Sequence, residues 1–152
     1  MMRERFGAAG VFCRSLSTEG REAVLARIAE ALERDGSILF AYCFGSFAEG
    51  RDFADVDLAV YSDPDKAGGE DLLKKEIDLT AAAERAGGIP ADVVILNTAS
   101  LGLRMAAIRG RLVFSRDESR RLEFVEITSS EYMDTAFLRR ESLRDVLGGA
   151  SA

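Results

Sequence analysis

Residues 44–60 read FGSFAEGRDFADVDLAV and carry the pattern that decides the fold. The pair Gly45-Ser46 directly follows an apolar run, and two aspartates one residue apart, Asp55 and Asp57, lie inside a second apolar run. A carboxylate in an apolar strand is costly unless its charge is compensated, and two carboxylates on one face also repel each other. A divalent metal ion removes both costs, and a helical turn starting at Ser46 would point free N–H groups at a phosphate. The stretch therefore predicts metal-dependent chemistry on a nucleotide.

The spacing of the two aspartates places them where metal ions could bind. Successive strand residues rise about 3.3 Å, so the Cα atoms of Asp55 and Asp57 lie roughly 6.6 Å apart with both side chains on one face. Such carboxylates can converge on two metal ions about 3.5–4 Å apart, the spacing of two-metal phosphoryl chemistry. Asp92, at the start of a later apolar run, is the natural third ligand. An open sheet face could also present these carboxylates to water without any function; the Gly45-Ser46 pair upstream favours the functional interpretation.

The composition excludes several classes of protein. The chain has 152 residues, 47 % hydrophobic and 30 % charged, as in one soluble globular domain. It contains no histidine, which excludes His-based acid–base catalysis, Ser-His-Asp triads and His-containing zinc sites. A formal net charge of −6 argues against extensive nucleic-acid binding through a basic surface. No apolar run is long enough to cross a bilayer, and the N-terminus makes a poor signal peptide, so we expect no membrane contact and a cytoplasmic protein.

Hydrophobic periodicity and turn residues divide the chain into helices and strands. Helical patterns cover residues 17–35, 70–85 and 100–109, strand patterns cover 38–44, 55–61, 91–96 and 112–115, and residues 118–144 form one long helix or two. This order predicts an α+β fold with a small mixed β-sheet of three to four strands packed with helices. We expect a single domain over residues 15–147, with a core at 38–96, a C-terminal helical part at 100–147, and flexible tails at 1–14 and 148–152.

Five residues of this pattern match the signature of a known enzyme family. The sequence resembles the minimal nucleotidyltransferases of the DNA polymerase β superfamily, in which Gly-Ser, a spacer and Asp-x-Asp are followed by a third Asp on a later strand. The matching residues are Gly45, Ser46, Asp55, Asp57 and Asp92. The resemblance implies a polymerase-β-like nucleotidyltransferase fold and two Mg²⁺ ions, for which Mn²⁺ can substitute, with ATP as substrate. It further implies that Asp55 and Asp57 hold both metal ions, that Asp92 ligates one of them and helps deprotonate the attacking hydroxyl, and that Gly45 and Ser46 bind the β- and γ-phosphates.

A narrower resemblance involves the C-terminal part. Residues 101–109, the stretch 110–114 and the stretch 131–134 are similar to the MntA-type adenylyltransferase antitoxins. That resemblance implies transfer of AMP from ATP to a tyrosine of a HEPN-domain toxin, which is thereby silenced. The chain departs from the family in its eight-residue spacer between Ser46 and Asp55, in Ala54 where a serine is common, and in Glu49 where a basic residue is common. Neither substitution removes a metal ligand.

Two other functions use the same site. A nucleotidyltransferase could instead modify a small-molecule hydroxyl, as in antibiotic modification, although the chain shows no second domain to build an acceptor pocket. A catalytically silent nucleotide-binding protein could neutralise its partner by binding alone. The nucleotide base and a homo-oligomeric state are left open by the sequence.

Overall fold

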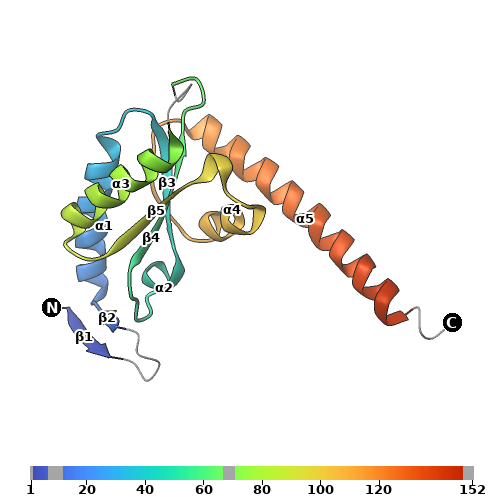
Figure 1. The fold of residues 1–152 in the computed structure, drawn as a ribbon, viewed down its shortest axis with the longest axis horizontal. Coiled ribbons are helices and arrows are strands. Elements are labelled where there is room, and N and C mark those ends of the chain that lie inside the picture. Colours follow the sequence, from blue (N-terminus) through green and yellow to red (C-terminus); the bar gives the residue numbers. More distant parts are fainter. Residues whose placement is uncertain (1, 7–11, 67–70, 149–152) are drawn as a thin grey trace.

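The computed structural model describes residues 2–6, 12–66 and 71–148. A two-stranded hairpin precedes a four-stranded sheet and its helices (Figure 1). In chain order the elements are β1 (Arg3–Phe6), β2 (Phe12–Ser15), α1 (Thr18–Glu33), β3 (Ile38–Phe44), α2 (Gly45–Ala48), β4 (Val56–Ser62), α3 (Leu72–Gly87), β5 (Ala91–Ile95), the 3₁₀ turn η1 (Leu96–Thr98), α4 (Leu101–Ile108), β6 (Arg111–Ser115) and α5 (Glu118–Gly148). Each segment for which the sequence predicts a helix or strand contains that element.

The central sheet is mixed, with strand order β5-β4-β3-β6. Strand β3 pairs antiparallel with both β4 and β6, whereas β4 and β5 run parallel. The parallel pair is joined by α3, which provides the crossover that such a connection needs. The predicted α+β fold with a small mixed sheet is therefore confirmed, at the upper end of the expected three to four strands.

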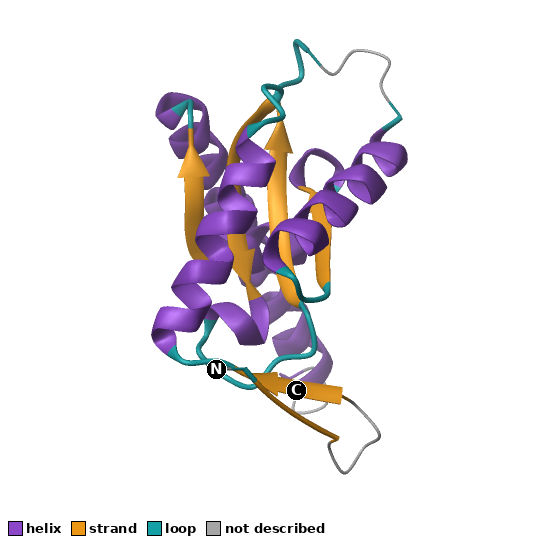
Figure 2. Cartoon of the chain, turned by 90° about the vertical axis from the view of Figure 1, so that its left-hand side faces the viewer, coloured by secondary structure: helices purple, strands orange, loops and turns teal. Residues whose placement is uncertain are grey.

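Helices cover both faces of this sheet. Helices α1 and α3 lie on one face, which Figure 2 views from the front, and α4 and α5 lie on the other. The first core contains apolar side chains of α1 and α3 packed on alternate residues of β4, among them Ile28, Leu32, Ala83, Val56 and Leu58. The second core, under α4 and α5, contains Leu39, Phe40, Tyr42, Ala59, Leu96 and Ala107, with Phe124 of α5 packed against it. The alternation of strand side chains between two cores fixes the register of β4.

Local signals explain where α1 and α3 start and where α3 ends. Ser17 caps α1 by accepting a hydrogen bond from the backbone N–H of Gly20 (3.1 Å). Asp71 caps α3 by accepting from the N–H groups of Leu73 (3.1 Å) and Lys74 (3.3 Å). Helix α3 ends at Gly88, whose φ of 72° lies in the left-handed region that glycine tolerates.

The C-terminal part forms one continuous helix. Of the two alternatives left open by the sequence, one long helix or two, α5 is one helix of 31 residues. Its first half packs on α4 and β3, and its second half extends away from the body (Figure 1). None of the helices in the described residues combines the length and apolar character needed to cross a membrane.

Within the expected N-terminal tail at residues 1–14, the structure describes residues 2–6 and 12–14, and residues 1 and 7–11 lie outside the described residues. Strands β1 and β2 pair antiparallel, and Arg14 and Phe53 then form a backbone bridge, with N–H to O distances of 2.7 and 3.0 Å. The pairing partner of Arg14 lies far along the chain, so no local pattern could predict it. Of the other expected tail, Gly148 ends α5 and residues 149–152 lie outside the described residues.

Candidate active site

The residues predicted to bind nucleotide and metal gather at one edge of the central sheet. Strand β3 ends at Phe44 and is followed at once by Gly45 and Ser46. Because β3 runs antiparallel to β4 and β5, the end of β3 meets the starts of the other two strands. Asp57 is the register partner of Phe44 on one side and of Asp92 on the other. The sheet therefore brings together residues that are 47 positions apart in the sequence, from Gly45 to Asp92.

The carboxylates occupy the sheet face that α4 and α5 cover farther along. Asp57 alternates with the buried residues Val56 and Leu58, so it shares the face of Ala59, which is packed in the second core. Asp55 precedes β4 by one residue and is partly buried, as Asp57 is, whereas Asp92 is exposed. The edge of this face thus carries three negative charges at the boundary between core and solvent.

The electrostatics of Asp57 show that the three carboxylates interact. Burial, with the charges of Asp55 and Asp92 as smaller causes, raises the pKa of Asp57 from 3.8 to about 6. A raised pKa means that the ionised form is disfavoured in the absence of a compensating cation. A perturbed carboxylate at a cluster of like charges is typical of a functional site.

Position 45 requires a glycine because the side chain of Asp57 lies close to it. Its φ is 75°, and a Cβ atom on residue 45 would lie 2.5 Å from Oδ2 of Asp57. The absence of a side chain at this position leaves room for the Asp57 carboxylate. Any other residue would have to displace that carboxylate.

Ser46 lies in the short helical turn that the sequence predicts after the Gly-Ser pair. The backbone N–H of Glu49 donates to the carbonyl of Gly45 (3.1 Å), and that of Arg51 donates to the carbonyl of Ser46 (3.0 Å). Phe47 anchors the turn, since it is 3 % exposed and meets the ring of Phe53 edge-on at 4.9 Å. The turn therefore holds a defined position beside the carboxylates.

Two arginines outside the predicted signature hold the spacer between Ser46 and Asp55. The guanidinium of Arg21, on α1, donates to the carbonyls of Leu16 (3.1 Å), Phe47 (2.9 Å) and Arg51 (2.8 Å). Arg14, on β2, donates to the carbonyl of Ala54 (2.8 Å). Sequence reasoning missed both residues, because an arginine that binds distant backbone carbonyls leaves no local pattern.

The donor chemistry of the edge fits Mg²⁺. Among the residues that the structure describes, no three or more His, Cys, Asp or Glu side chains are already arranged round one metal position. However, carboxylate oxygens are the ligands that Mg²⁺ prefers, and it usually takes one or two of them together with water and substrate phosphates. Burial and the charges of Asp55 and Asp92 disfavour the ionised form of Asp57, and a bound cation would favour it. We therefore keep Asp55, Asp57 and Asp92 as predicted ligands of the metal ions.

Cys43, next to Phe44 at the end of β3, is a core residue rather than a nucleophile. Both Cys13 and Cys43 are free thiols. Burial, with the charge of Asp57 as a smaller cause, raises the pKa of Cys43 to about 12. A thiol that stays neutral at physiological pH is a poor nucleophile, so Cys43 serves as a small core residue.

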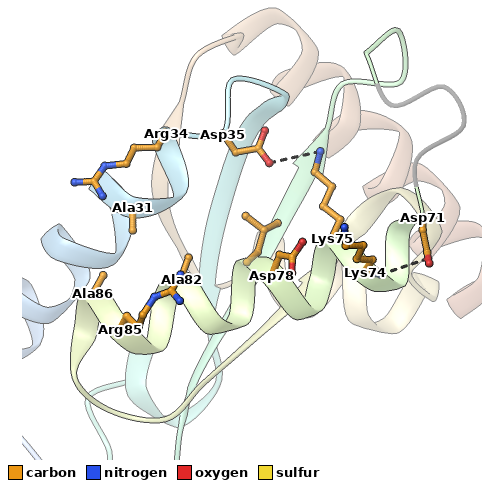
Figure 3. Close-up of a pocket in the computed structure, with 11 residues that line it drawn as sticks. Ala31, Arg34, Asp35, Asp71, Lys74, Lys75, Asp78, Ala82, Arg85 and Ala86 are labelled. Atoms are coloured by element: carbon orange, nitrogen blue, oxygen red, sulfur yellow. Dashed lines mark hydrogen bonds and ion pairs between the residues drawn. The ribbon is translucent and has the colours of Figure 1, made fainter.

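The groove of about 870 Å³ between α1 and α3 lies on the other face of the sheet (Figure 3). It is lined by residues of both helices and of the turn after α1, including Arg34, Asp35, Lys75 and Arg85. Across it, Lys75 and Asp35 form an ion pair of 3.6 Å. None of the five predicted site residues lines this groove, so its size alone does not make it the active site.

Comparison with solved structures finds the same fold in toxin–antitoxin complexes. A chain of the structure of a tri-AMPylated Shewanella oneidensis HEPN toxin in complex with an MNT antitoxin is 20 % identical, with a TM-score of 0.62, over 84 % of this chain and 98 % of that chain. A chain of a toxin–antitoxin structure with AMP-PNP is 23 % identical, with a TM-score of 0.64, over 81 % of this chain and 98 % of that chain. At these identities the likeness establishes the fold.

Sequence comparison gives the family. A search of curated protein sequences returns no significant match. The family model described as polymerase beta, nucleotidyltransferase, matches residues 26–119, which is more than half of the chain and includes all five signature residues. The chain therefore belongs to the polymerase β nucleotidyltransferase family.

Proposed function

We propose that this protein transfers AMP from ATP to a hydroxyl acceptor at the edge of the sheet that carries Asp55, Asp57 and Asp92. One observation carries the proposal: the register of β4 and β5 sets Asp57 beside Asp92, with Gly45 and Ser46 at the adjoining end of β3. The chain's membership of a nucleotidyltransferase family supports a shared site for metal ions and phosphate at this edge.

Each residue has a definite task in the proposed reaction. The turn at Gly45 and Ser46 binds the β- and γ-phosphates through backbone N–H groups and the Ser46 hydroxyl. The acceptor oxygen attacks the α-phosphorus, the bond from that phosphorus to the bridging β-oxygen breaks, and pyrophosphate leaves. Asp92, the exposed carboxylate, takes the proton of the attacking hydroxyl. Mg²⁺, when bound by Asp55, Asp57 and Asp92, supplies charge stabilisation for the phosphates.

The proposed acceptor is a tyrosine of a HEPN-type toxin, which makes this protein an antitoxin. The similar structures support this choice, because one holds a tri-AMPylated HEPN toxin with its antitoxin and another holds an ATP analogue. We further propose that the protein acts in the cytoplasm, where both ATP and Mg²⁺ are supplied.

The experiment that tests the proposal follows the α-phosphate of ATP. Wild type, Asp55→Asn/Asp57→Asn and the control Asp78→Asn, an exposed carboxylate on α3, are each incubated with α-phosphate-labelled ATP, Mg²⁺ and host lysate. We expect one labelled protein that is absent with the double variant and present with the control. Mass spectrometry of that band identifies the acceptor and the modified residue.

Two results would contradict the proposal. Label found in a small molecule rather than in protein would favour an antibiotic-type acceptor. No label at all, with ATP binding intact and a purified HEPN partner added, would favour neutralisation by binding alone.

A further inference from the structure

The second half of α5 exposes large apolar side chains to water. Helix α5 leaves the body of the protein after its first half (Figure 1). Its exposed apolar residues are Leu122, Ile127, Met133, Phe137, Leu138, Leu143, Val146 and Leu147, each with 50 % or more of its surface accessible. An apolar surface of this extent on a soluble protein indicates an interaction site.

Part of this apolar surface follows a coiled-coil seam. Counting alternately four and three residues along α5 gives a single row, here named the α5 seam: Leu122, Glu126, Ser129, Met133, Ala136, Arg140, Leu143 and Leu147. This alternation is the spacing of the two core positions of a heptad repeat, which lie on one side of a helix. The row spans about 25 residues, or roughly 38 Å at about 1.5 Å per residue.

The α5 seam faces away from the body of the protein. Phe124 packs into the second core, Thr128 is fully buried, and Glu131 forms an ion pair with Arg104 of α4 (3.1 Å). With about 100° of rotation per residue, these three positions lie on the side of the helix opposite the seam. Six of the eight seam residues are exposed and only Ser129 and Ala136 are partly buried, so the body leaves most of the seam open.

The charges within the seam are arranged symmetrically. Glu126 lies one heptad before Met133 and Arg140 lies one heptad after it. Within the described residues, neither Glu126 nor Arg140 has a hydrogen bond or ion pair, in contrast to most arginines of the fold. An acid in the first half and a base in the second half make the seam complementary to itself when it is reversed.

We propose that α5 pairs antiparallel with α5 of a second copy of this chain through the α5 seam. In the register centred between Met133 and Ala136, Leu122 packs against Leu147 of the second copy, and Met133 packs against Ala136 of the second copy. Glu126 then lies one layer from Arg140 of the second copy, and the two-fold axis repeats this ion pair. A parallel pair would instead place Glu126 against Glu126 and Arg140 against Arg140, which is unfavourable.

The self-complementary charge is the reason to assign the seam to a second copy. An isologous interface requires that residue i contact residue j while j contacts i, so an acid and a base that meet across the axis meet twice. A different protein docked on the seam would impose no such symmetry. The dimer goes beyond the proposed transfer reaction and does not depend on it.

The first test changes the charges and measures association. Sedimentation equilibrium over a range of concentrations is expected to show a dimer for wild type and a roughly tenfold weaker one for Glu126→Arg or Arg140→Glu, since each change affects two symmetry-related pairs. The double variant Glu126→Arg/Arg140→Glu restores opposite charges and is expected to restore the dimer. Asp134→Arg, an acid-to-arginine change on the same exposed helix outside the seam, is the matched control and leaves association unchanged.

The second test fixes the orientation. Leu122→Cys/Leu147→Cys is expected to form a disulfide-linked dimer on mild oxidation, while each single variant does not, because only the antiparallel register brings 122 and 147 together. A wild type that stays monomeric at every concentration would overturn the proposal. So would cross-linking of the single variants, which indicates a parallel pair, or a charge-reversed double variant that fails to recover.

Discussion

A Cβ atom on residue 45 would lie 2.5 Å from Oδ2 of Asp57. Position 45 therefore requires glycine for two reasons: the Asp57 carboxylate occupies the space that a Cβ would need, and the backbone φ is 75°. Because the two residues belong to the turn after β3 and to the start of β4, the antiparallel register of these strands creates the constraint. The Gly-Ser turn and the Asp-x-Asp pair are therefore two parts of one packed unit.

This relationship predicts that Gly45→Ala impairs catalysis more than stability. The added Cβ would approach Oδ2 of Asp57, which is at the end of a rotatable side chain. The fold can therefore accept the substitution by rotating the Asp57 carboxylate out of place. We expect roughly a hundredfold loss of transfer rate, since small misplacements of reacting groups have effects of that order. The stability cost is expected to be about 1 kcal/mol, from the left-handed backbone alone.

Gly50→Ala is the matched control for this prediction. Gly50 has a similar φ of 77°, but no atom lies within 4 Å of where its Cβ would be. Urea unfolding should show similar losses for both variants, while only Gly45→Ala loses transfer. Equal transfer rates in the two variants would show that the contact with Asp57 is unimportant.

The raised pKa of Asp57 predicts a pH-dependent stability in the absence of metal. The folded-state pKa of about 6 exceeds the unfolded value near 3.8, so the folded protein binds the proton more tightly. The ionised Asp57 carboxylate destabilises the folded state. This destabilisation is absent below about pH 3.8, grows as the pH rises toward 6 and is complete above it. We expect Asp57→Asn to be more stable than wild type at pH 7.5 without Mg²⁺, by about 1 kcal/mol because the carboxylate is only partly buried.

The advantage of Asp57→Asn should disappear near pH 4, where Asp57 is protonated in wild type. Urea unfolding at pH 4 and pH 7.5 measures the difference, with Asp78→Asn, an exposed carboxylate on α3, as the matched control. A constant difference between Asp57→Asn and wild type at both pH values would mean that the asparagine acts through packing rather than charge.

The same titration predicts how metal binding responds to acid. A proton and a cation compete for the Asp57 carboxylate, so the affinity for Mg²⁺ should fall as the pH drops below about 6. Isothermal titration with Mg²⁺ and a non-hydrolysable ATP analogue at pH 5, 6 and 7.5 measures this fall. Unchanged affinity at pH 5 would exclude Asp57 as a ligand.

Much of the site could be predicted from the sequence, because its signal is local. Asp55 and Asp57 stand in an apolar run where charges are costly, and the Gly45-Ser46 pair follows another apolar run directly. The alternation within β4, together with the apolar stretch that begins β5, predicts that Asp57 and Asp92 lie on neighbouring strands. Helix α5 also carries a local signal, the absence of Gly and Pro over residues 118–144, but only the structure shows that it is one continuous helix.

The remainder depends on contacts between distant segments. Arg21 binds three backbone carbonyls, two of them about 30 residues away, and Arg14 forms an isolated backbone bridge with Phe53, about 40 residues away. From the sequence alone, an arginine in an amphipathic helix is interpreted as a solvated residue whether or not it makes such contacts. The N-terminal hairpin likewise makes its contact with a distant loop, through the backbone bridge between Arg14 and Phe53.

Arg21→Lys is therefore predicted to loosen the turn that follows Gly45. Lysine cannot reproduce the planar fork that serves Leu16, Phe47 and Arg51, so about 2 kcal/mol of stability should be lost together with a rise in the KM for ATP. Arg27→Lys is the control, because Arg27 lies on the same helix and donates to the carbonyls of Ala86 and Gly87, away from the site. Equal KM values in the two variants would contradict a role for Arg21 in positioning the phosphate-binding turn.

The most direct test of nucleotidyl transfer compares two labels of ATP in one purified reaction. The protein and its acceptor are incubated with Mg²⁺ and ATP that carries the label on either the α- or the γ-phosphate, beside Asp57→Asn. We predict that α-label enters the acceptor, that γ-label leaves as pyrophosphate, and that Asp57→Asn does neither. Transfer of the γ-label, or α-label transfer that persists in Asp57→Asn, would contradict an AMP transferase built on this edge of the sheet.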